Sequence, residues 1–287
     1  MQYDANIGLV LEGGGLRGIF SSGVLRHFDD LRIPFTSVYG VSMGACNGAN
    51  YVSKQPERNR ITSTRFVNDS RYLSFLRLLK GGDLFGMDFI FREIPLNLVP
   101  IDYETLRDNP VKFWIGVTDC VSGKPVLFEK DMLSTREELL TVMRASASLP
   151  LIAEPVEFNG AIYMDGGIAN PIPVQQCLAQ GEKPVLVLTQ PAGYRKRASK
   201  SVKVCKWRYP RYSGLIHVIE RRHEEYNDLL AAIEAKEKRG DIFVLRPENT
   251  FDVGRVCRDQ RKLYALYDSG YMLARERSEE LLEFLSV

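Results

Sequence analysis

"IGLVLEGGGLRG" (residues 7–18) places a cluster of glycines directly after an apolar run that is typical of a β-strand. Residues 13–18 fit the G-x-G-x-x-G pattern of dinucleotide-binding proteins, which requires an acidic residue about 20 positions further on, after a second strand. Here the second predicted strand, Ser37–Tyr39, is followed by "GVSMG" (residues 40–44), which contains no acid. The glycine loop is therefore better explained by a role other than dinucleotide binding.

Ser42 is the candidate nucleophile, because it occupies the centre of a G-x-S-x-G motif between a predicted strand and a small-residue helix, Gly44–Val52. Glycines at positions 40 and 44 remove the Cβ atoms that would clash in so tight a turn. The N-terminus of the following helix supplies free N–H groups beside a developing oxyanion. The motif alone is common and also fits a structural turn, whereas its strand–turn–helix context favours a nucleophile.

Backbone N–H donors that face the tetrahedral oxygen are the other requirement of acyl transfer, and glycines allow consecutive N–H groups to converge on one point. Successive strands are usually neighbours, so the loop at residues 13–18 is expected beside Ser42. Arg17 either adds positive charge there, fixes the loop, or is an ordinary solvated side chain. The glycine loop is thus a candidate oxyanion hole.

A serine nucleophile needs a base, and none of the three histidines, His27, His217 and His223, has a motif around it. Asp165 does, because "YMDGGIANPIP" (residues 163–173) places it after an apolar run and before Gly166 and Gly167. The glycines permit a turn that presents the carboxylate at a strand end. A simple Asp-Gly hairpin turn is the alternative for this stretch.

Composition indicates a globular protein with an ample core, since 45% of the 287 residues are hydrophobic and 26% are charged. The formal net charge of +2 gives no global reason to expect a polyanion partner, and no nucleic-acid-binding motif is present. The five scattered cysteines have no C-x-x-C spacing, which disfavours a zinc site or a disulfide framework. With no run of about 18 apolar residues and a short polar start, the sequence predicts a cytoplasmic protein.

Short apolar strands alternate with helical patterns, which predicts an α/β fold with a mainly parallel sheet covered on both faces. Further strands are expected at residues 112–119, 125–129, 156–158, 184–189 and 241–245. Further helices are expected at residues 18–31, 135–147, 173–179, 215–238, 257–267 and 270–284. Residues 53–110 and 194–212 break this rhythm, and the latter stretch carries eight Lys or Arg residues without an acid.

Three motifs in this order, "GGGLRG", "GVSMG" and "DGG" followed by Asn-Pro, resemble the patatin-like phospholipases. "RASASLP" (residues 144–150) and "VTDCVSGKP" also fit, and the resemblance covers roughly residues 6–190. It implies a three-layer α/β/α sandwich and a lipid acyl hydrolase of phospholipase A, lysophospholipase or esterase type, which uses no metal or other cofactor. We expect a catalytic core at 1–193 with a variable insert at 53–110, a basic excursion at 194–212, and a C-terminal helical region with one further strand at 213–287.

The resemblance also assigns residue roles, with Ser42 as nucleophile and Asp165 as its base in a serine–aspartate dyad. Since an unassisted carboxylate is a weak base for serine, Asp165 should be partly buried so that its pKa is raised. The implied oxyanion donors are the N–H groups of Gly14 and Gly15, of Leu16 or Arg17, and of Met43. The residues that support the motifs are Gly13, Gly18, Gly40, Gly44, Gly166, Gly167 and Asn170.

Two other interpretations stay open. A Ser–His–Asp esterase would use His217 or His223 as base, although a nucleophile only 42 residues into the chain argues against it. A non-catalytic lipid- or nucleotide-binding module would use the glycine loop alone.

Two segments are candidates for contact with a lipid substrate or a membrane. The apolar residues of "LFGMDFIF" (residues 84–91) either line an acyl-chain site or belong to the core. The basic stretch at 194–212, with Trp207, Tyr209 and Tyr212, either contacts an anionic membrane surface peripherally or is a solvated loop.

Overall fold

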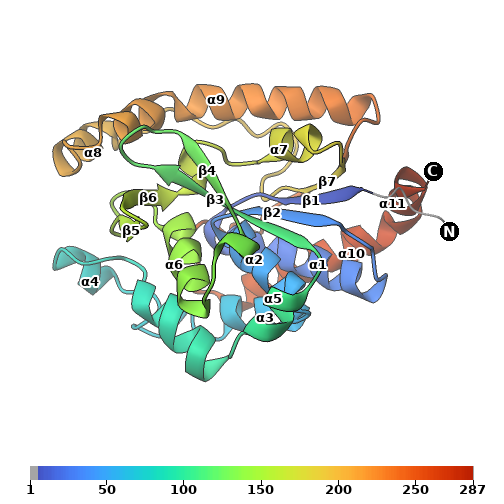
Figure 1. Cartoon of the computed structure of the whole chain (residues 1–287), viewed down its shortest axis with the longest axis horizontal. Coiled ribbons are helices and arrows are strands. Elements are labelled where there is room, and N and C mark those ends of the chain that lie inside the picture. The colour runs from blue at the N-terminus through green and yellow to red at the C-terminus, as the bar shows by residue number, and fades with distance from the viewer. Residues whose placement is uncertain (1–5, 287) are drawn as a thin grey trace.

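The computed structural model describes residues 6–286 and contains one eight-stranded sheet with helices on both faces (Figure 1). The strands are β1 (Ile7–Leu11), β2 (Ser37–Val41), β3 (Lys112–Asp119), β4 (Pro125–Glu129), β5 (Val156–Phe158), β6 (Ala161–Asp165), β7 (Lys183–Val187) and β8 (Phe243–Leu245). Their order is β5-β6-β3-β2-β1-β7-β8, and β4 pairs with β3 outside this path. The pairs from β8 through β7, β1 and β2 to β3 are parallel, whereas β4 and β6 pair antiparallel with β3.

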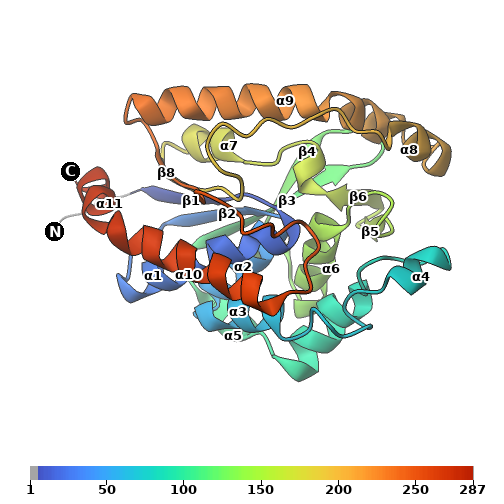
Figure 2. The same cartoon turned by 180° about the vertical axis from the view of Figure 1, so that it is seen from behind.

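Helices cover the sheet on both sides, so the predicted three-layer α/β/α sandwich is confirmed (Figures 1 and 2). The helices are α1 (Ile19–Asp30), α2 (Met43–Val52), α3 (Pro56–Thr64), α4 (Phe75–Leu79), α5 (Tyr103–Asp108), α6 (Arg136–Ala147), α7 (Val174–Ala179), α8 (Val202–Arg208), α9 (Ser213–Lys238), α10 (Gln260–Glu276) and α11 (Ser278–Leu285). The short 3-10 turns are η1 (Gly15–Gly18), η3 (Lys130–Met132) and η4 (Gly166–Ile168), and η2 (Phe89–Leu98) is a π-helical segment. α7 and α9 lie on one face, and α1, α2, α6 and α10 lie on the other.

The central strands explain why their sequence is apolar without alternation. Every residue of β1 and β2 is buried, because helices pack against both faces of the sheet at this point. β1 and β2 are parallel with Leu11 opposite Gly40, so the glycine loop and the serine turn leave the sheet at the same edge. β2 pairs with β3 as far as Gly116, and β6 pairs with β3 from Val117 onward. The ends of β2 and β6 therefore meet beside neighbouring residues of β3.

Residues 53–110 are largely helical, and this segment forms the far layer below the sheet through α3, α4, η2 and α5 (Figure 1). Many of its large apolar side chains, Phe66, Leu73 and Phe89 among them, belong to the main hydrophobic core, whereas those of α4 are exposed or half-buried. Because the helices are short and irregular, the sequence of this segment showed no sustained hydrophobic periodicity.

The C-terminal region adds β8 to the sheet beside β7 and packs α10 along α1 (Figure 2). The predicted helix break before Gly270 was wrong, because α10 continues through this glycine and ends at Glu276. A Cβ at Gly270 would collide with the carbonyl oxygen of Phe20, so the glycine permits a close helix crossing and does not end a helix. Among residues 6–286, no helix has the length and apolar character needed to cross a bilayer.

Candidate active site

Ser42 lies in a sharp strand-to-helix turn between β2 and α2, with φ 57° and ψ −126°. A positive φ is strained for a residue with a Cβ, and such strain concentrates at functional sites. The turn is held from behind, because the Ser42 N–H donates to Ser146 Oγ at 2.8 Å and that hydroxyl donates to the Gly116 carbonyl at 2.6 Å. The Ser42 residue is 8% exposed, so its hydroxyl faces a confined space.

Asp165 ends β6 and faces the same space. Ser42 and Asp165 line one cavity of about 40 Å³. Asp165 Oδ1 accepts a hydrogen bond from the Gly167 N–H at 2.8 Å, whereas Oδ2 is buried without a partner of hydrogen-bond geometry within residues 6–286. The residue is only 2% exposed, and this burial raises the pKa of Asp165, against smaller lowering effects of Arg222, the Ser42 hydroxyl and the Gly167 N–H. A buried carboxylate with a raised pKa and a free oxygen is suited to accept a proton.

The glycine loop packs directly against Ser42. A Cβ at Gly13 would lie 2.8 Å from Ser42 Cβ, and a Cβ at Gly15, whose φ is +57°, would lie 2.6 Å from the Arg255 carbonyl oxygen. The hydrogen bonds within residues 6–286 leave the N–H groups of Gly14, Gly15 and Met43 without an acceptor. These groups stay candidates for an oxyanion hole.

One candidate donor has to be removed from that set. The Leu16 N–H donates to the Arg255 carbonyl at 3.1 Å and is therefore not free to bind an oxyanion. This bond anchors the loop to the segment between β8 and α10, which no pattern in the sequence indicated. The Arg17 side chain lines the cavity, and its Nε is buried without a partner in the part of the chain described.

The remaining motif residues support the turns around the cavity. A Cβ at Gly18, Gly40, Gly44 or Gly166 would collide with a neighbouring segment, so each of them permits a close approach of the backbone. Asn170 donates its side-chain amide to Gln176 at 3.0 Å, and its N–H donates to the Gly166 carbonyl at 2.9 Å. Asn170 therefore closes the turn after Asp165 from outside the cavity.

Arg222 of α9 is a site residue that the sequence did not reveal, because it lies within a charged helix that looked solvated. Its Nε donates to the Gly167 carbonyl at 2.8 Å, and Gly167 in turn donates its N–H to Asp165. The Arg222 charge is the largest influence that lowers the pKa of Asp165. Arg222 thus holds the turn that follows Asp165, and its charge opposes the rise in the Asp165 pKa that burial causes.

We expect Arg222→Met to move the acid limb of the pH profile of ester hydrolysis to higher pH. Loss of the positive charge raises the pKa of Asp165 further, and a carboxylate that acts as a base must be deprotonated. The measurement is kcat/KM against pH for a neutral p-nitrophenyl ester, with Arg221→Met on the same helix as the control. An acid limb that stays in place or moves to lower pH would contradict this role.

No histidine is among the residues that line the cavity of Ser42 and Asp165 in the described chain. His27 hydrogen-bonds Ser278 Oγ at 2.7 Å and stacks edge-on against Tyr271, which is a packing role between α1 and the C-terminal helices. His217 is exposed on α9, and His223 lines a separate, larger cavity next to this one.

The apolar segment at 84–91 is mostly core. Leu84, Met87, Phe89 and Phe91 are buried in the main cluster. Ile90 and Phe91 also line a cavity of about 60 Å³ beneath α2, which includes Met43 directly after the nucleophile. Within this segment, Ile90 and Phe91 are therefore the side chains that line a cavity next to Ser42 in the described chain.

Comparison with known proteins identifies the family. A family model described as patatin-like phospholipase matches residues 9–178, more than half of the chain. The chain belongs to the patatin-like phospholipase family. This places it among proteins of the lipid acyl hydrolase kind, in agreement with the three motifs that now meet around Ser42. A second model, described only as a domain of unknown function, DUF6363, matches residues 212–286.

Relatives of this patatin-like protein differ widely in length. The uncharacterized protein YjjU of Escherichia coli is 30% identical over 254 residues, which are 84% of this chain and 68% of that one. Lysophospholipase NTE1 of Yarrowia lipolytica is 26% identical over 266 residues, 85% of this chain but only 18% of that one. The crystal structure of VipD from Legionella pneumophila shares the fold, with a TM-score of 0.52 at 13% identity over 96% of this chain and 67% of that one.

Proposed function

We propose that this patatin-like protein hydrolyses acyl esters of lipids through a Ser42–Asp165 dyad. The observation that carries the proposal is the shared cavity, in which a serine at a strained turn meets a buried carboxylate that has one unpartnered oxygen. Gly14 and Gly15, whose N–H groups have no acceptor within residues 6–286, line the same cavity, and no described lining residue is a histidine. This arrangement supplies a nucleophile, a base and oxyanion donors without a third catalytic side chain.

The reaction proceeds in two halves. Asp165 takes the Ser42 hydroxyl proton as Ser42 Oγ bonds to the ester carbonyl carbon, and the carbonyl oxygen becomes an oxyanion held by the N–H groups of Gly14, Gly15 and Met43. Collapse of this intermediate breaks the bond to the alcohol, which leaves with the proton from Asp165. Water then attacks the acyl-serine while Asp165 accepts its proton, the fatty acid departs, and the proton returns to Ser42.

A direct test is covalent labelling. A fluorophosphonate probe should modify the wild-type protein at Ser42, as identified by peptide mass spectrometry, and the same protein should hydrolyse medium-chain p-nitrophenyl esters. An enzyme that neither reacts with the probe nor turns over any ester would favour the non-catalytic binding module.

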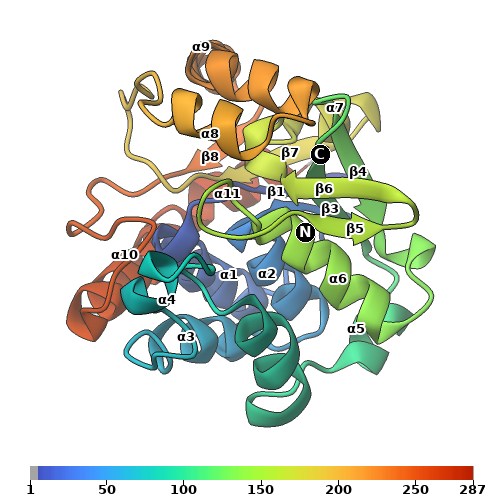
Figure 3. The ribbon, with the colours of Figure 1, turned by 90° about the vertical axis from the view of Figure 1, so that its left-hand side faces the viewer.

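We also propose that the end of the molecule formed by α4 and α8 contacts an anionic lipid surface. Both helices lie at the same end of the fold (Figure 3), and each exposes large apolar side chains, with Leu79 84% and Trp207 80% exposed. In the basic segment, Lys206 pairs with Glu220 and Arg208 pairs with Glu154. Lys200 and Lys203 are exposed and have no acidic partner within residues 6–286, so their charges are available to a membrane.

Vesicle sedimentation should show this contact. We expect Lys200→Gln/Lys203→Gln to weaken binding to phosphatidylglycerol vesicles roughly 30-fold, because each of the two surface cations contributes about 1 kcal/mol. Leu79→Ser/Trp207→Ser should also weaken binding, and neither pair should affect folding because all four side chains are exposed. Lys238→Gln/Arg239→Gln, at the other end of α9, is the control, because it removes the same number of positive charges far from α4 and α8. Equal binding by all of these proteins would reject the membrane contact.

A further inference from the structure

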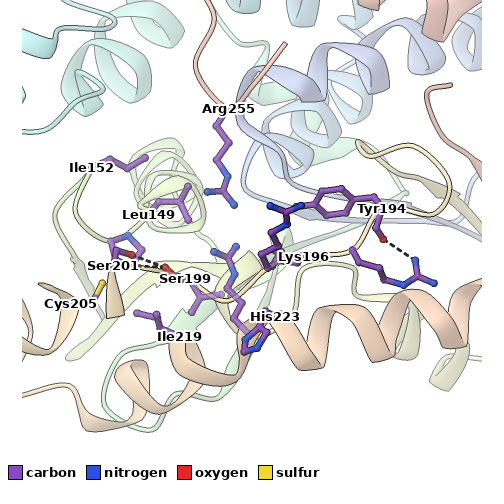
Figure 4. Close-up of a pocket in the computed structure, with 15 residues that line it drawn as sticks. Leu149, Ile152, Tyr194, Lys196, Ser199, Ser201, Cys205, Ile219, His223 and Arg255 are labelled. Carbon is purple, nitrogen blue, oxygen red and sulfur yellow. Dashed lines mark hydrogen bonds between the residues drawn. The ribbon is translucent and has the colours of Figure 1, made fainter. Parts of the chain in front are cut away.

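A second, larger cavity of about 680 Å³ lies next to the cavity of Ser42 and Asp165 (Figure 4). The two cavities share Leu149, Tyr194, Lys196, Arg222 and Arg255 as lining residues. In Figure 4, Arg255 points into the space from the side opposite α9, and Lys196 lies between it and the helix. A group bound in the larger cavity would therefore lie close to an ester held at Ser42.

All charged residues that line the larger cavity in the described chain are basic: Arg195, Lys196, Arg197, Arg222 and Arg255. Arg195 is neutralised by Glu234 at 2.9 Å. The other four have no acidic partner within hydrogen-bonding or ion-pair distance among residues 6–286, and Lys196 lies 3.9 Å above the Tyr226 ring. Glu12 and Asp165 of the neighbouring cavity act on Lys196 only from beyond ion-pair distance, so the cations stay concentrated here and a bound anion would stabilise them.

The pKa of Lys196 reflects this concentration of positive charge. Burial, followed by the nearby charges of Arg222 and Arg255, lowers the pKa of Lys196 to about 7. An anion among these three side chains would reverse that repulsion. Arginine forks and a lysine ammonium are also the groups that proteins use to hold phosphate oxygens.

We propose that this cavity binds the headgroup of the lipid whose ester Ser42 attacks, and that it selects a phosphate headgroup of net negative charge. The inference rests on the proposed function and adds its substrate class. A choline headgroup is disfavoured, because a quaternary ammonium needs carboxylates or several aromatic faces, and Tyr194 is the single Phe, Tyr or Trp among the described lining residues. The volume suits a headgroup, since ligand cavities typically measure roughly 300–1,000 Å³.

The selecting residues come from outside the part of the chain that matches the patatin-like family model, residues 9–178. Arg222 and Arg255 belong to residues 212–286, which match the domain of unknown function, and Lys196 precedes that region. The C-terminal region therefore completes the active site of the core, with α9 and the segment before α10 as opposite walls of the headgroup cavity.

The test compares three substrates that share one acyl chain and are presented in the same neutral detergent micelles: lysophosphatidic acid, lysophosphatidylcholine and monoacylglycerol. For the wild type, we expect kcat/KM to be about tenfold or more higher for lysophosphatidic acid than for either other lipid, as charge-assisted hydrogen bonds permit. Lys196→Gln/Arg255→Gln should reduce this preference about tenfold or more. Arg221→Gln, an exposed residue of α9 outside both cavities, should leave the preference unchanged.

Binding to Ser42→Ala protein gives a readout that does not depend on hydrolysis. Calorimetry should show that lysophosphatidic acid binds more tightly than glycerol 3-phosphate or inorganic phosphate, and that Lys196→Gln/Arg255→Gln weakens all three. Hydrolysis without any headgroup preference would overturn the headgroup site and leave the hydrolase proposal standing. Equal binding of inorganic phosphate and lysophosphatidic acid would also overturn it, in favour of a free-phosphate site. Phosphate-dependent binding in a wild type that hydrolyses no ester would support the anion cavity and reject the hydrolase.

Discussion

Asp165→Asn is expected to abolish ester hydrolysis while the protein stays folded. The amide keeps the size of the carboxylate and can still accept the Gly167 N–H, but it cannot take the Ser42 proton. Ser42→Ala removes the nucleophile itself, and we expect each variant to lose about 10³-fold or more of kcat/KM. Because the two residues act in the same step, the double variant should be little worse than either single one.

Asp165→Asn should not lower the free energy of unfolding. The direction of this effect follows from the pKa of Asp165. Burial raises that pKa above the value in the unfolded chain. Between the two pKa values the native state binds more protons, so the free energy of unfolding falls as the pH rises through this interval. Above the interval, the ionised buried carboxylate destabilises the fold by a constant amount that asparagine does not carry. The Tm of Asp165→Asn should equal or exceed that of the wild type at pH 7, and the difference should shrink toward acid pH.

Matched controls separate chemistry from folding. Ser21→Ala removes another buried hydroxyl, one that has no partner in the described part of the chain, and should keep full activity. Asp108→Asn makes the same acid-to-amide change at an exposed site. His217→Ala and His223→Ala should each keep most of the activity, whereas loss in either would support a Ser–His–Asp triad. An active Asp165→Asn enzyme would contradict the dyad.

The sequence was sufficient to predict the sheet and to single out Ser42 and Asp165, which the structure places in one cavity, because each was encoded by a local pattern. Apolar runs without alternation marked β1 and β2 as strands covered on both faces. Ser42 follows β2 and Asp165 ends β6, and each has nearby glycines of the kind that a tight turn requires. Parallel pairing of β1 with β2 brings the glycine loop and Ser42 to one edge of the sheet, whereas Asp165 arrives there because β6 runs antiparallel to β3 and ends beside Val117.

The residues around Ser42 and Asp165 could not be predicted, because they come from segments that are distant in the sequence. Arg222 belongs to a helix whose charged sequence is typical of a solvated surface, and only the docking of α9 on the sheet turns it toward Gly167. Ser146 supports the Ser42 turn across more than 100 positions of sequence, through a single side-chain hydroxyl. The hydrogen bond from the Leu16 N–H to the Arg255 carbonyl joins two backbone groups, so the residue types at these positions do not indicate it.

Gly15→Ala is expected to reduce kcat/KM about 10²- to 10³-fold in a protein that still folds, which is the loss typical of a damaged oxyanion hole. Alanine is strained at the φ of +57° that Gly15 adopts, and its Cβ would lie 2.6 Å from the Arg255 carbonyl oxygen and 2.9 Å from Arg255 Cα. Backbone atoms cannot turn aside as a flexible side chain does. The loop must therefore move away from Arg255, which displaces the N–H groups of Gly14 and Gly15 from the oxyanion position.

Gly240→Ala separates this clash from backbone strain alone. Gly240 has a φ of +76°, and no atom lies within 4 Å of the position that a Cβ would take, so alanine there carries the conformational cost without a collision. We expect Gly240→Ala to lower the free energy of unfolding by about 1 kcal/mol and to keep wild-type kcat/KM. Gly15→Ala should lose turnover at every acyl-chain length while still reacting with the fluorophosphonate probe more slowly than the wild type. If Gly15→Ala keeps more than half of the wild-type kcat/KM, the glycine loop does not hold the oxyanion, and the N-terminus of α2 must supply those donors alone.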